Sequence, residues 1–316
     1  MYRRILITGC AGLVGREVLN VLDTITDKSA FDVLGVDNLL YEDDFLHPCK
    51  FQRGNVGDSS FMQMILKNYK PTHIIHLAGI VGDAVCSARP KEAYEANITS
   101  LEILRDNFDG RIIWMSSCSV YGANDNLVNE TSPLNPLSLY AEMKVQGEAI
   151  LKDKNALILR LGTLHGISGR FRNDLIVNVL AIRALIEKTL SIYGGAQYRP
   201  LLSVHDLANW IVFDFLKSDL VGTFNLLENN YRVKDIADIV KRVLPETVIE
   251  ITEMPYEDKR NYKVSFEKAK KTFGLLRKFS VYNTVKEIEK IYLEGRIKDY
   301  SNIKYSNMTA LQLGSK

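Results

Sequence analysis

The sequence lacks an excess of either charge, a long apolar run and a signal peptide. Its 316 residues carry 40 Lys and Arg against 38 Asp and Glu, a net charge of +2, whereas a dedicated nucleic-acid binder has a strong basic excess. No run of about 18 apolar residues occurs, so no membrane-spanning helix is predicted. The N-terminus enters the apolar segment Ile5–Gly9 directly and has no cleavage signal. We therefore expect a cytoplasmic protein with neither nucleic-acid nor membrane partners.

Cysteine is scarce and unpaired in the sequence. The four cysteines are Cys10, Cys49, Cys86 and Cys118, and no Cys-x-x-Cys pair is present. This spacing argues against a zinc knuckle or a dithiol redox motif, so we predict reduced thiols and no metal site. Disorder is excluded by the 46% of apolar residues and the small net charge.

Strand-like and helical segments alternate over the first 165 residues. The predicted strands are 3–8, 31–37, 72–77, 111–116 and 156–161, and the predicted helices are 12–23, 59–68, 91–107 and 139–152. Such alternation predicts an α/β fold with a Rossmann-like, doubly wound parallel sheet. Residues 166–316 are less regular, with predicted helices at 174–187, 233–243 and 284–293 and short strands at 201–204 and 223–227. We predict a dinucleotide-binding domain over 1–165, and a smaller mixed α/β substrate-binding part over 166–316 that is interleaved with it.

A glycine-rich turn follows the first predicted strand. Gly9, Gly12 and Gly15 form G-x-x-G-x-x-G before a helix, where the backbone can approach a pyrophosphate. Asp37 ends the second predicted strand 22 residues after Gly15. A carboxylate there bonds a ribose 2′-hydroxyl and repels a 2′-phosphate, which favours NAD over NADP. Asp58, after a third short strand, has two open interpretations: a contact to the adenine amino group or a helix cap.

Tyr140 and Lys144 indicate proton chemistry. They stand four residues apart in a predicted helix and so share a face. A nearby ammonium and a positively charged nicotinamide would lower the pKa of a tyrosine that is otherwise near 10. Ser117 lies just beyond the predicted strand 111–116, at the ligand end of a parallel sheet.

Together these motifs resemble the extended short-chain dehydrogenase/reductases, in particular the NAD-dependent nucleotide-sugar epimerases and dehydratases. The resemblance covers nearly the whole chain. It also includes His76–Gly79, Asn97, Ser116–Gly122, Arg199–Asp206 and Arg260–Tyr262. It implies that Tyr140 is the general base, that Lys144 binds the nicotinamide ribose, and that Ser117 orients the reacting sugar hydroxyl.

The resemblance also implies a set of binding residues. The cofactor-binding residues would be Gly9, Gly12, Leu13, Val14, Gly15, Asp37, Asn38, Val56, Asp58, Leu77, Ala78, Gly79, Asn97, Tyr140 and Lys144. The substrate-binding residues would be Ser117, Cys118, Ser119, Asn178, Arg199 and Arg260, with both arginines on the nucleotide diphosphate. Members commonly form homodimers through two helices per subunit, here 91–107 and 139–152.

The reaction expected from the resemblance is hydride transfer at C4 of a nucleotide-linked sugar, most simply 4-epimerisation. The 4,6-dehydratases place Asp-Glu after the residue that matches Ser117, but this chain has Cys118-Ser119. The open alternatives are a C4 dehydrogenase or 4-keto reductase, a C3/C5 epimerase that uses Cys118 alone or paired with His165, and a dinucleotide-binding protein without catalysis.

Overall fold

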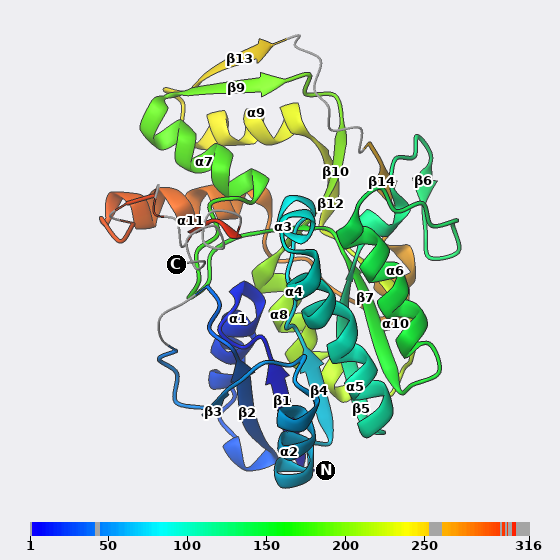
Figure 1. Ribbon diagram of the computed structural model, residues 1–316. Coiled ribbons are helices and arrows are strands. Elements are labelled where there is room, and N and C mark those ends of the chain that lie inside the picture. Colours follow the sequence, from blue (N-terminus) through cyan, green and yellow to red (C-terminus); the bar gives the residue numbers. More distant parts are fainter. Residues whose placement is uncertain are drawn as a thin grey trace.

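The computed structural model describes residues 2–41, 45–252, 261–297, 299–300, 302 and 305–307 (Figure 1). Arg260, one of the predicted diphosphate ligands, lies outside these described residues.

A seven-stranded parallel sheet forms the centre of the protein, which confirms the predicted fold class. Its strand order is β11-β7-β5-β4-β1-β2-β3. Because β2 and β3 extend the sheet on one side of β1 and β4 starts on the other, the strand order reverses between β1 and β4, where open α/β sheets bind ligands. The strands are β1 (Arg3–Thr8), β2 (Phe31–Asp37), β3 (Lys50–Arg53), β4 (His73–His76), β5 (Arg111–Ser117), β7 (Ala156–Leu161) and β11 (Gly222–Leu226).

Helices cover both faces of this sheet, as the apolar runs in its strands require. They are α1 (Leu13–Asp23), α2 (Ser59–Tyr69), α3 (Asp83–Ala88), α4 (Pro90–Tyr94), α5 (Ser100–Asn107), α6 (Leu139–Leu151) and α8 (Val204–Phe213), with short 3₁₀ turns at Lys28–Ala30, Cys118–Tyr121 and Phe215–Lys217. The single predicted helix 91–107 is wrong in one respect. A π-helical turn, Glu95–Thr99, separates α4 from α5, and its Asn97 is buried with Nδ2 donating to the Ile80 carbonyl at 2.9 Å.

Most of the remaining elements build a smaller part with its own apolar core, which Figure 1 shows above the sheet in the view drawn. It contains β8 (Thr163–His165), β10 (Tyr198–Ser203) and β12 (Asn229–Arg232) in one sheet, the pair β9 (Thr189–Tyr193) with β13 (Val248–Thr252), and α7 (Ile176–Glu187), α9 (Val233–Val243) and α11 (Val281–Leu293). The pair β6 (Leu127–Val128) with β14 (Lys263–Val264) and α10 (Glu267–Phe273) instead contribute to the core of the main sheet.

The chain returns to the main sheet after residue 166. β11 adds the edge strand beside β7, and α8 packs against α1. The sequence analysis missed α8, which begins where the Ser203 hydroxyl accepts a hydrogen bond from the His205 N–H at 3.2 Å. The second part therefore supplies elements to both cores, while the proposed domain boundary at residue 165 stays a prediction. None of the helices described here is long and apolar enough to cross a membrane.

Candidate active site

A cavity of about 860 Å³ opens at the carboxyl ends of β1, β2, β4 and β5, below loops from the smaller part. It is the size of a pocket that binds a small molecule or cofactor. Most of the predicted site residues line it: Gly9, Gly12, Leu13, Val14, Gly15, Asp37, Asn38, Val56, Leu77, Ala78, Gly79, Ser117, Ser119, Tyr140, Lys144 and Arg199.

The glycine turn packs closely against the neighbouring backbone. Gly9 has φ +72°, and a Cβ there would lie 2.6 Å from the Ala78 nitrogen. A Cβ on Gly15 would lie 2.4 Å from the Gly9 carbonyl oxygen, so this glycine allows α1 to pack against the turn. Gly12 caps α1 without a side-chain hydrogen bond. The turn therefore presents the N-terminus of α1 to the cavity, an arrangement that suits a pyrophosphate.

Asp37 lies beside this turn at the end of β2. Its Oδ2 accepts from the Ala11 N–H at 3.0 Å and its Oδ1 from the Leu39 N–H at 2.8 Å. Burial raises the pKa of Asp37 above its ordinary value, although both hydrogen bonds oppose that shift. A carboxylate accepts about four hydrogen bonds, so each oxygen has a further site for a hydroxyl. The Asp37 carboxylate is therefore placed to accept hydrogen bonds from the ribose hydroxyls of NAD.

Ser117 and Tyr140 meet across the cavity. Tyr140 lies in the first turn of α6, which begins where Ser138 Oγ accepts from the Ala141 N–H at 3.2 Å. The Tyr140 and Ser117 side chains both line the cavity, and Ser117 Oγ accepts from Ser119 Oγ at 2.9 Å. A hydroxyl placed between Ser117 and Tyr140 can therefore be held and deprotonated at one point.

The electrostatics of Tyr140 and Lys144 differ from the sequence expectation. Burial raises the pKa of Tyr140, while Ser117 acts to lower it. Burial also lowers the pKa of Lys144 to about 8. The Lys144 ammonium donates to the Met115 carbonyl at 2.7 Å and lies 5.5 Å from the centre of the Tyr140 ring. Because desolvation acts on both groups, the ammonium alone does not lower the Tyr140 pKa below its ordinary value.

A buried ion pair connects α6 with the strands beneath Ser117. Glu148, one turn after Lys144, pairs with Arg160 of β7 through Oε1–Nε at 2.8 Å and Oε2–Nη2 at 2.7 Å. Ser116 Oγ donates to the same Glu148 Oε1 at 2.6 Å, and Arg160 Nη1 donates to the Tyr121 hydroxyl at 2.8 Å. These contacts fix α6, which carries the base, against the strand end that carries Ser117.

Four predicted site residues do not line the cavity. Asp58 caps α2 by accepting from the Phe61 N–H at 3.0 Å, which is the second of its two interpretations. Asn97 and Asn178 are buried and bond loop backbone, Asn97 at Ile80 and Asn178 at both polar groups of Gly166. Asn178 thus shapes the loop after β8 and does not contact the cavity from its buried position.

Cys118 is the fourth residue outside the cavity. It is 1% exposed, its Sγ donates to the Arg160 carbonyl at 3.2 Å, and burial raises the pKa of its thiol. His165, its suggested partner, bonds Thr284 Oγ1 and Glu228 Oε2, both at 2.9 Å. These contacts give Cys118 and His165 packing and hydrogen-bonding roles in place of the acid–base pair considered from sequence.

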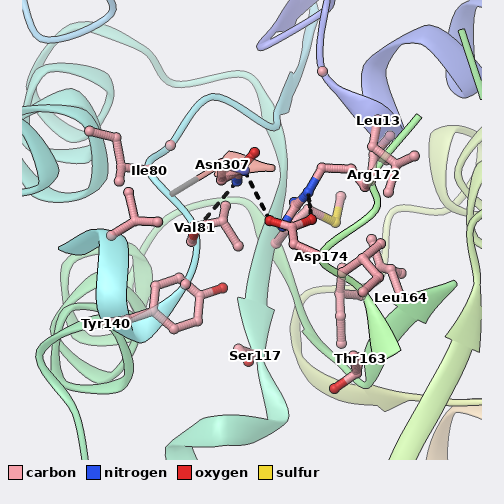
Figure 2. Close-up of a pocket in the computed structure, with 18 of the residues that line it drawn as sticks. Leu13, Ile80, Val81, Ser117, Tyr140, Thr163, Leu164, Arg172, Asp174 and Asn307 are labelled. Atoms are coloured by element: carbon pink, nitrogen blue, oxygen red, sulfur yellow. Dashed lines mark hydrogen bonds and ion pairs between the residues drawn. The ribbon is translucent and has the colours of Figure 1, made fainter. Parts of the chain in front are cut away.

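The roof of the cavity holds residues that were not among the predicted site residues. Arg172 and Asp174 form a two-point ion pair at 2.6 and 2.8 Å, and Asn307 lies against it (Figure 2). Tyr41 and Arg170 also line the cavity, with the Arg170 guanidinium 4.4 Å from the Tyr41 ring centre. Arg170-Phe171-Arg172-Asn173-Asp174, where two arginines precede an aspartate, was the available signal. Among the described residues, no group of three or more His, Cys, Asp or Glu could hold a metal ion.

The fold and the cavity define a dinucleotide-dependent enzyme of the Rossmann type. The sequence model of the NAD dependent epimerase/dehydratase family matches residues 5–227. The chain belongs to this family of NAD-dependent enzymes, which confirms the predicted enzyme class and cofactor.

Individual relatives are more distant. UDP-glucuronate 4-epimerase 2 of Arabidopsis thaliana is 30% identical over 218 residues, which are 61% of this chain and 49% of the relative. The chain thus spans about half the length of the first curated relatives it matches. Two solved structures share the fold over nearly their whole length. UDP-glucuronic acid 4-epimerase of Bacillus cereus, solved with UDP-glucuronic acid and NAD, has a TM-score of 0.77 at 22% identity and covers 92% of this chain and 99% of its own. The dTDP-glucose 4,6-dehydratase of Bacillus anthracis, solved with NAD, has a TM-score of 0.77 at 20% identity and covers 93% of this chain and 98% of its own.

Proposed function

We propose that the protein is an NAD-dependent epimerase that inverts C4 of a nucleotide-linked sugar. The observation that carries the proposal is one cavity lined both by Ser117, Tyr140 and Lys144 and by the dinucleotide features, the glycine turn and Asp37. The dinucleotide and the sugar would therefore bind side by side, within reach of the residue that transfers the proton.

The residues present fit the cofactor. The glycine turn at the start of α1 would hold the pyrophosphate, Asp37 the adenosine ribose and Lys144 the nicotinamide ribose. When bound, the oxidised nicotinamide supplies the hydride acceptor and a positive charge. Such a charge favours the phenolate of a tyrosine whose pKa burial otherwise raises.

Tyr140 would take the proton of the C4 hydroxyl while the C4–H bond breaks and its electron pair leaves as hydride. C4 then becomes a ketone, and Ser117 holds the ketone oxygen where it held the hydroxyl. After the sugar ring turns over, C4 would regain its hydride on the opposite face and Tyr140 would give its proton back to the oxygen. Atoms and electrons balance over the cycle, so the net reaction is the inversion of C4.

Arg199 is the described candidate for the nucleotide diphosphate. It lies on β10, lines the cavity, is 8% exposed and donates through Nη1 to the Tyr198 carbonyl at 2.9 Å. The planar fork of a guanidinium matches the oxygens of a phosphate, which makes Arg199 a candidate ligand for the diphosphate. Arg260, outside the described residues, stays a proposed second ligand.

Two features argue against 4,6-dehydration and against epimerisation at C3 or C5. Cys118 and Ser119 follow Ser117, so the two carboxyl groups expected of a 4,6-dehydratase are missing there. Epimerisation at C3 or C5 through Cys118 loses support because this thiol is buried behind β5, bonded to the Arg160 carbonyl. Homodimerisation through the α4–α5 segment and α6 is part of the same proposal.

The test is mass spectrometry of nucleotide sugars incubated with the protein and NAD in heavy water. UDP-glucuronate and UDP-glucose come first, because relatives are named for them. An isomer of unchanged mass is the expected product. An isomer that carries deuterium would indicate epimerisation at C3 or C5, and a product that has lost two hydrogens would indicate a C4 dehydrogenase. No change with any nucleotide sugar, in either oxidation state, would contradict the proposal.

A further inference from the structure

The C-terminal segment Tyr305–Asn307 lies over the cavity and contacts both of its sides. Ser306 and Asn307 line the cavity, and the Asn307 side chain is 3% exposed. Figure 2 shows Asn307 in the roof, between Val81 and Asp174 and across the cavity from Tyr140 and Ser117. A segment far along the sequence from the glycine turn thus completes the same site.

Three hydrogen bonds hold Asn307, and they reach two separate loops. Its Oδ1 accepts from Arg170 Nη2 at 2.8 Å and its backbone N–H donates to Asp174 Oδ2 at 3.0 Å, both in the loop after β8. Its Nδ2 donates to the Val81 carbonyl at 3.4 Å, in the loop after β4. Because Val81 belongs to the dinucleotide side and Arg170 and Asp174 to the smaller part, one amide side chain bridges the two sides.

Neighbouring contacts fix the segment where it meets the roof. The Tyr305 ring packs edge-on against Phe171 with centres 5.5 Å apart, and the Asn173 N–H donates to the Tyr305 carbonyl at 2.8 Å. The Asn173 side chain also donates to the Tyr300 carbonyl at 3.0 Å. The segment therefore has an anchor of its own beside the bridge.

Both residues that Asn307 holds are connected to the predicted chemistry. Arg170 lies near enough to Asp37 for its charge to lower the pKa of that carboxyl, against the stronger effect of burial. Asp174, the other partner, fixes Arg172 by the two-point ion pair, and the charge of Arg172 opposes the burial that raises the pKa of Tyr140. Movement of Asn307 would thus disturb the ribose side and the base side of the cavity together.

We propose that Tyr305–Asn307 is a latch over the active site and that Asn307 is a positioning residue within it. By joining the loops after β4 and β8, it keeps the dinucleotide and the oxidised sugar inside the cavity until the hydride returns. Retention of the keto sugar rests on the proposed function. Retention of the dinucleotide requires only the cofactor class of the family. A 4-epimerase needs such a closure, because its product forms only if the ketone stays beside the same cofactor while it turns over.

The experiment compares dinucleotide release from full-length wild type, Asn307→Ala, Asn307→Asp and the control Tyr300→Ala. Asn307→Ala removes both side-chain bonds of the bridge. Asn307→Asp removes the donor to Val81 and adds a second carboxylate beside Asp174. Tyr300 is 37% exposed and contributes its backbone carbonyl to Asn173, so its truncation leaves the bridge intact. Thermal unfolding first establishes that each variant is folded.

The first readout is the rate at which bound NADH is displaced by excess NAD, followed by fluorescence in stopped flow. Loss of both side-chain bonds of the bridge corresponds to roughly a tenfold change. We therefore expect about tenfold faster release from Asn307→Ala, a smaller increase from Asn307→Asp, which keeps an acceptor for Arg170, and wild-type release from Tyr300→Ala. A folded Asn307→Ala variant that releases NADH within twofold of wild type would overturn the latch. A wild type that binds no NADH would overturn it as well.

The second readout is the keto sugar itself, trapped with a hydroxylamine reagent during turnover. Asn307→Ala should release more trapped ketone per epimer formed than wild type does. Equal amounts from both proteins would limit the latch to the dinucleotide and overturn its role toward the sugar. If no nucleotide sugar reacts with wild type, the proposed function fails, and the NADH release rates still decide whether Asn307 closes the site.

Discussion

The two sides of the cavity are held together in different ways. The strand-end side, which carries the glycine turn, Asp37, Ser117 and Tyr140, follows parallel strands whose register is fixed by backbone hydrogen bonds. The roof side, which carries Arg170, Arg172, Asp174 and Asn307, is joined by side-chain bonds between loops and the C-terminal segment. The proposed chemistry thus lies on the side that backbone pairing fixes, while individual side-chain bonds hold the roof.

This difference separates two kinds of mutational effect. Changes on the strand-end side should reduce the chemical step, and changes in the roof should alter how long ligands stay. The release experiment on Asn307 tests the roof, and four substitutions outside the roof test the other half of that division, from the largest expected effect to the smallest.

Tyr140→Phe should have the largest effect. It removes the hydroxyl that is proposed to take the substrate proton, so kcat should fall by a factor of roughly 10² or more, the scale of a lost general base. NADH binding and the unfolding temperature should change little. Tyr94→Phe, at an exposed position on α4, is the matched control. Near-normal turnover of Tyr140→Phe would show that Tyr140 is not the general base.

The strand-end side was predictable because its signals are local. The Tyr140–Lys144 spacing lies within one helix, and the glycine turn joins neighbouring elements β1 and α1. The Arg170–Asn307 bond instead joins residues 137 positions apart, and no periodicity carries such a contact.

The errors of the sequence analysis have similar causes. A continuous helical pattern over 91–107 did not indicate the π-helical turn at Asn97, which depends on the Ile80 carbonyl of another loop. Apolar residues around 201–204 predicted a strand, and the following helix α8 was missed although Ser203 begins it. Asp58 had an acidic side chain at a plausible position, but only the structure distinguishes a helix cap from a cofactor contact.

Asp37→Ala should have the next largest effect, on the choice of cofactor. Removal of a carboxylate from the ribose site loses charged hydrogen bonds, each worth about 1.5–3 kcal/mol, and ends the repulsion of a 2′-phosphate. The ratio of kcat/KM for NAD to that for NADP should therefore fall about 10- to 100-fold. Asp32→Ala, on the same strand but paired with Lys50 outside the cavity, should leave the ratio unchanged. An unchanged ratio in Asp37→Ala would count against its ribose role.

Glu148→Gln tests whether the buried network transmits to the catalytic pair. The substitution keeps one acceptor oxygen but loses the charge that pairs with Arg160, so α6 is held less firmly against β5. We expect kcat to fall about tenfold, the equivalent of 1.4 kcal/mol, with little change in KM. Glu142→Gln, exposed on the same helix, should match wild type.

The pH profile distinguishes this role from loss of packing. Lys144 is faced by Glu148 and Tyr140 on α6, Cys86 on α3 and the neutral His76 of β4. Burial lowers the pKa of Lys144 to about 8, although Cys86 and Glu148 act to raise it. Activity that needs the ammonium should therefore fall as pH rises through about 8. Without the Glu148 charge this loss should begin at lower pH. A profile that keeps its position would reduce Glu148 to a structural residue.

His205→Gln should have the smallest effect on catalysis, because His205 connects the main sheet domain with the smaller part and does not line the cavity. His205 on α8 bonds Glu17 of α1 at 2.6 Å and Glu287 of α11 at 3.1 Å. Burial lowers the pKa of His205, but the two glutamates together raise it to about 10, against 6.5 as the ordinary value. Since the folded protein holds this proton more tightly than the unfolded chain, the stabilisation is complete below about pH 6.5 and is lost as pH rises through about 10.

Urea unfolding from pH 6 to pH 10 checks this prediction. The free energy of unfolding of His205→Gln should be lower than that of wild type by about 1 kcal/mol at pH 6, a value reduced by solvent screening at the partly exposed Glu287. The difference should shrink towards pH 10, while kcat at pH 7 stays within about twofold of wild type. A difference that is constant with pH would mean that His205 joins the regions by packing alone. A large loss of kcat would mean that the His205 contacts to α1 and α11 also control the geometry of the strand-end side. Residues outside the cavity would then determine the chemical step as well.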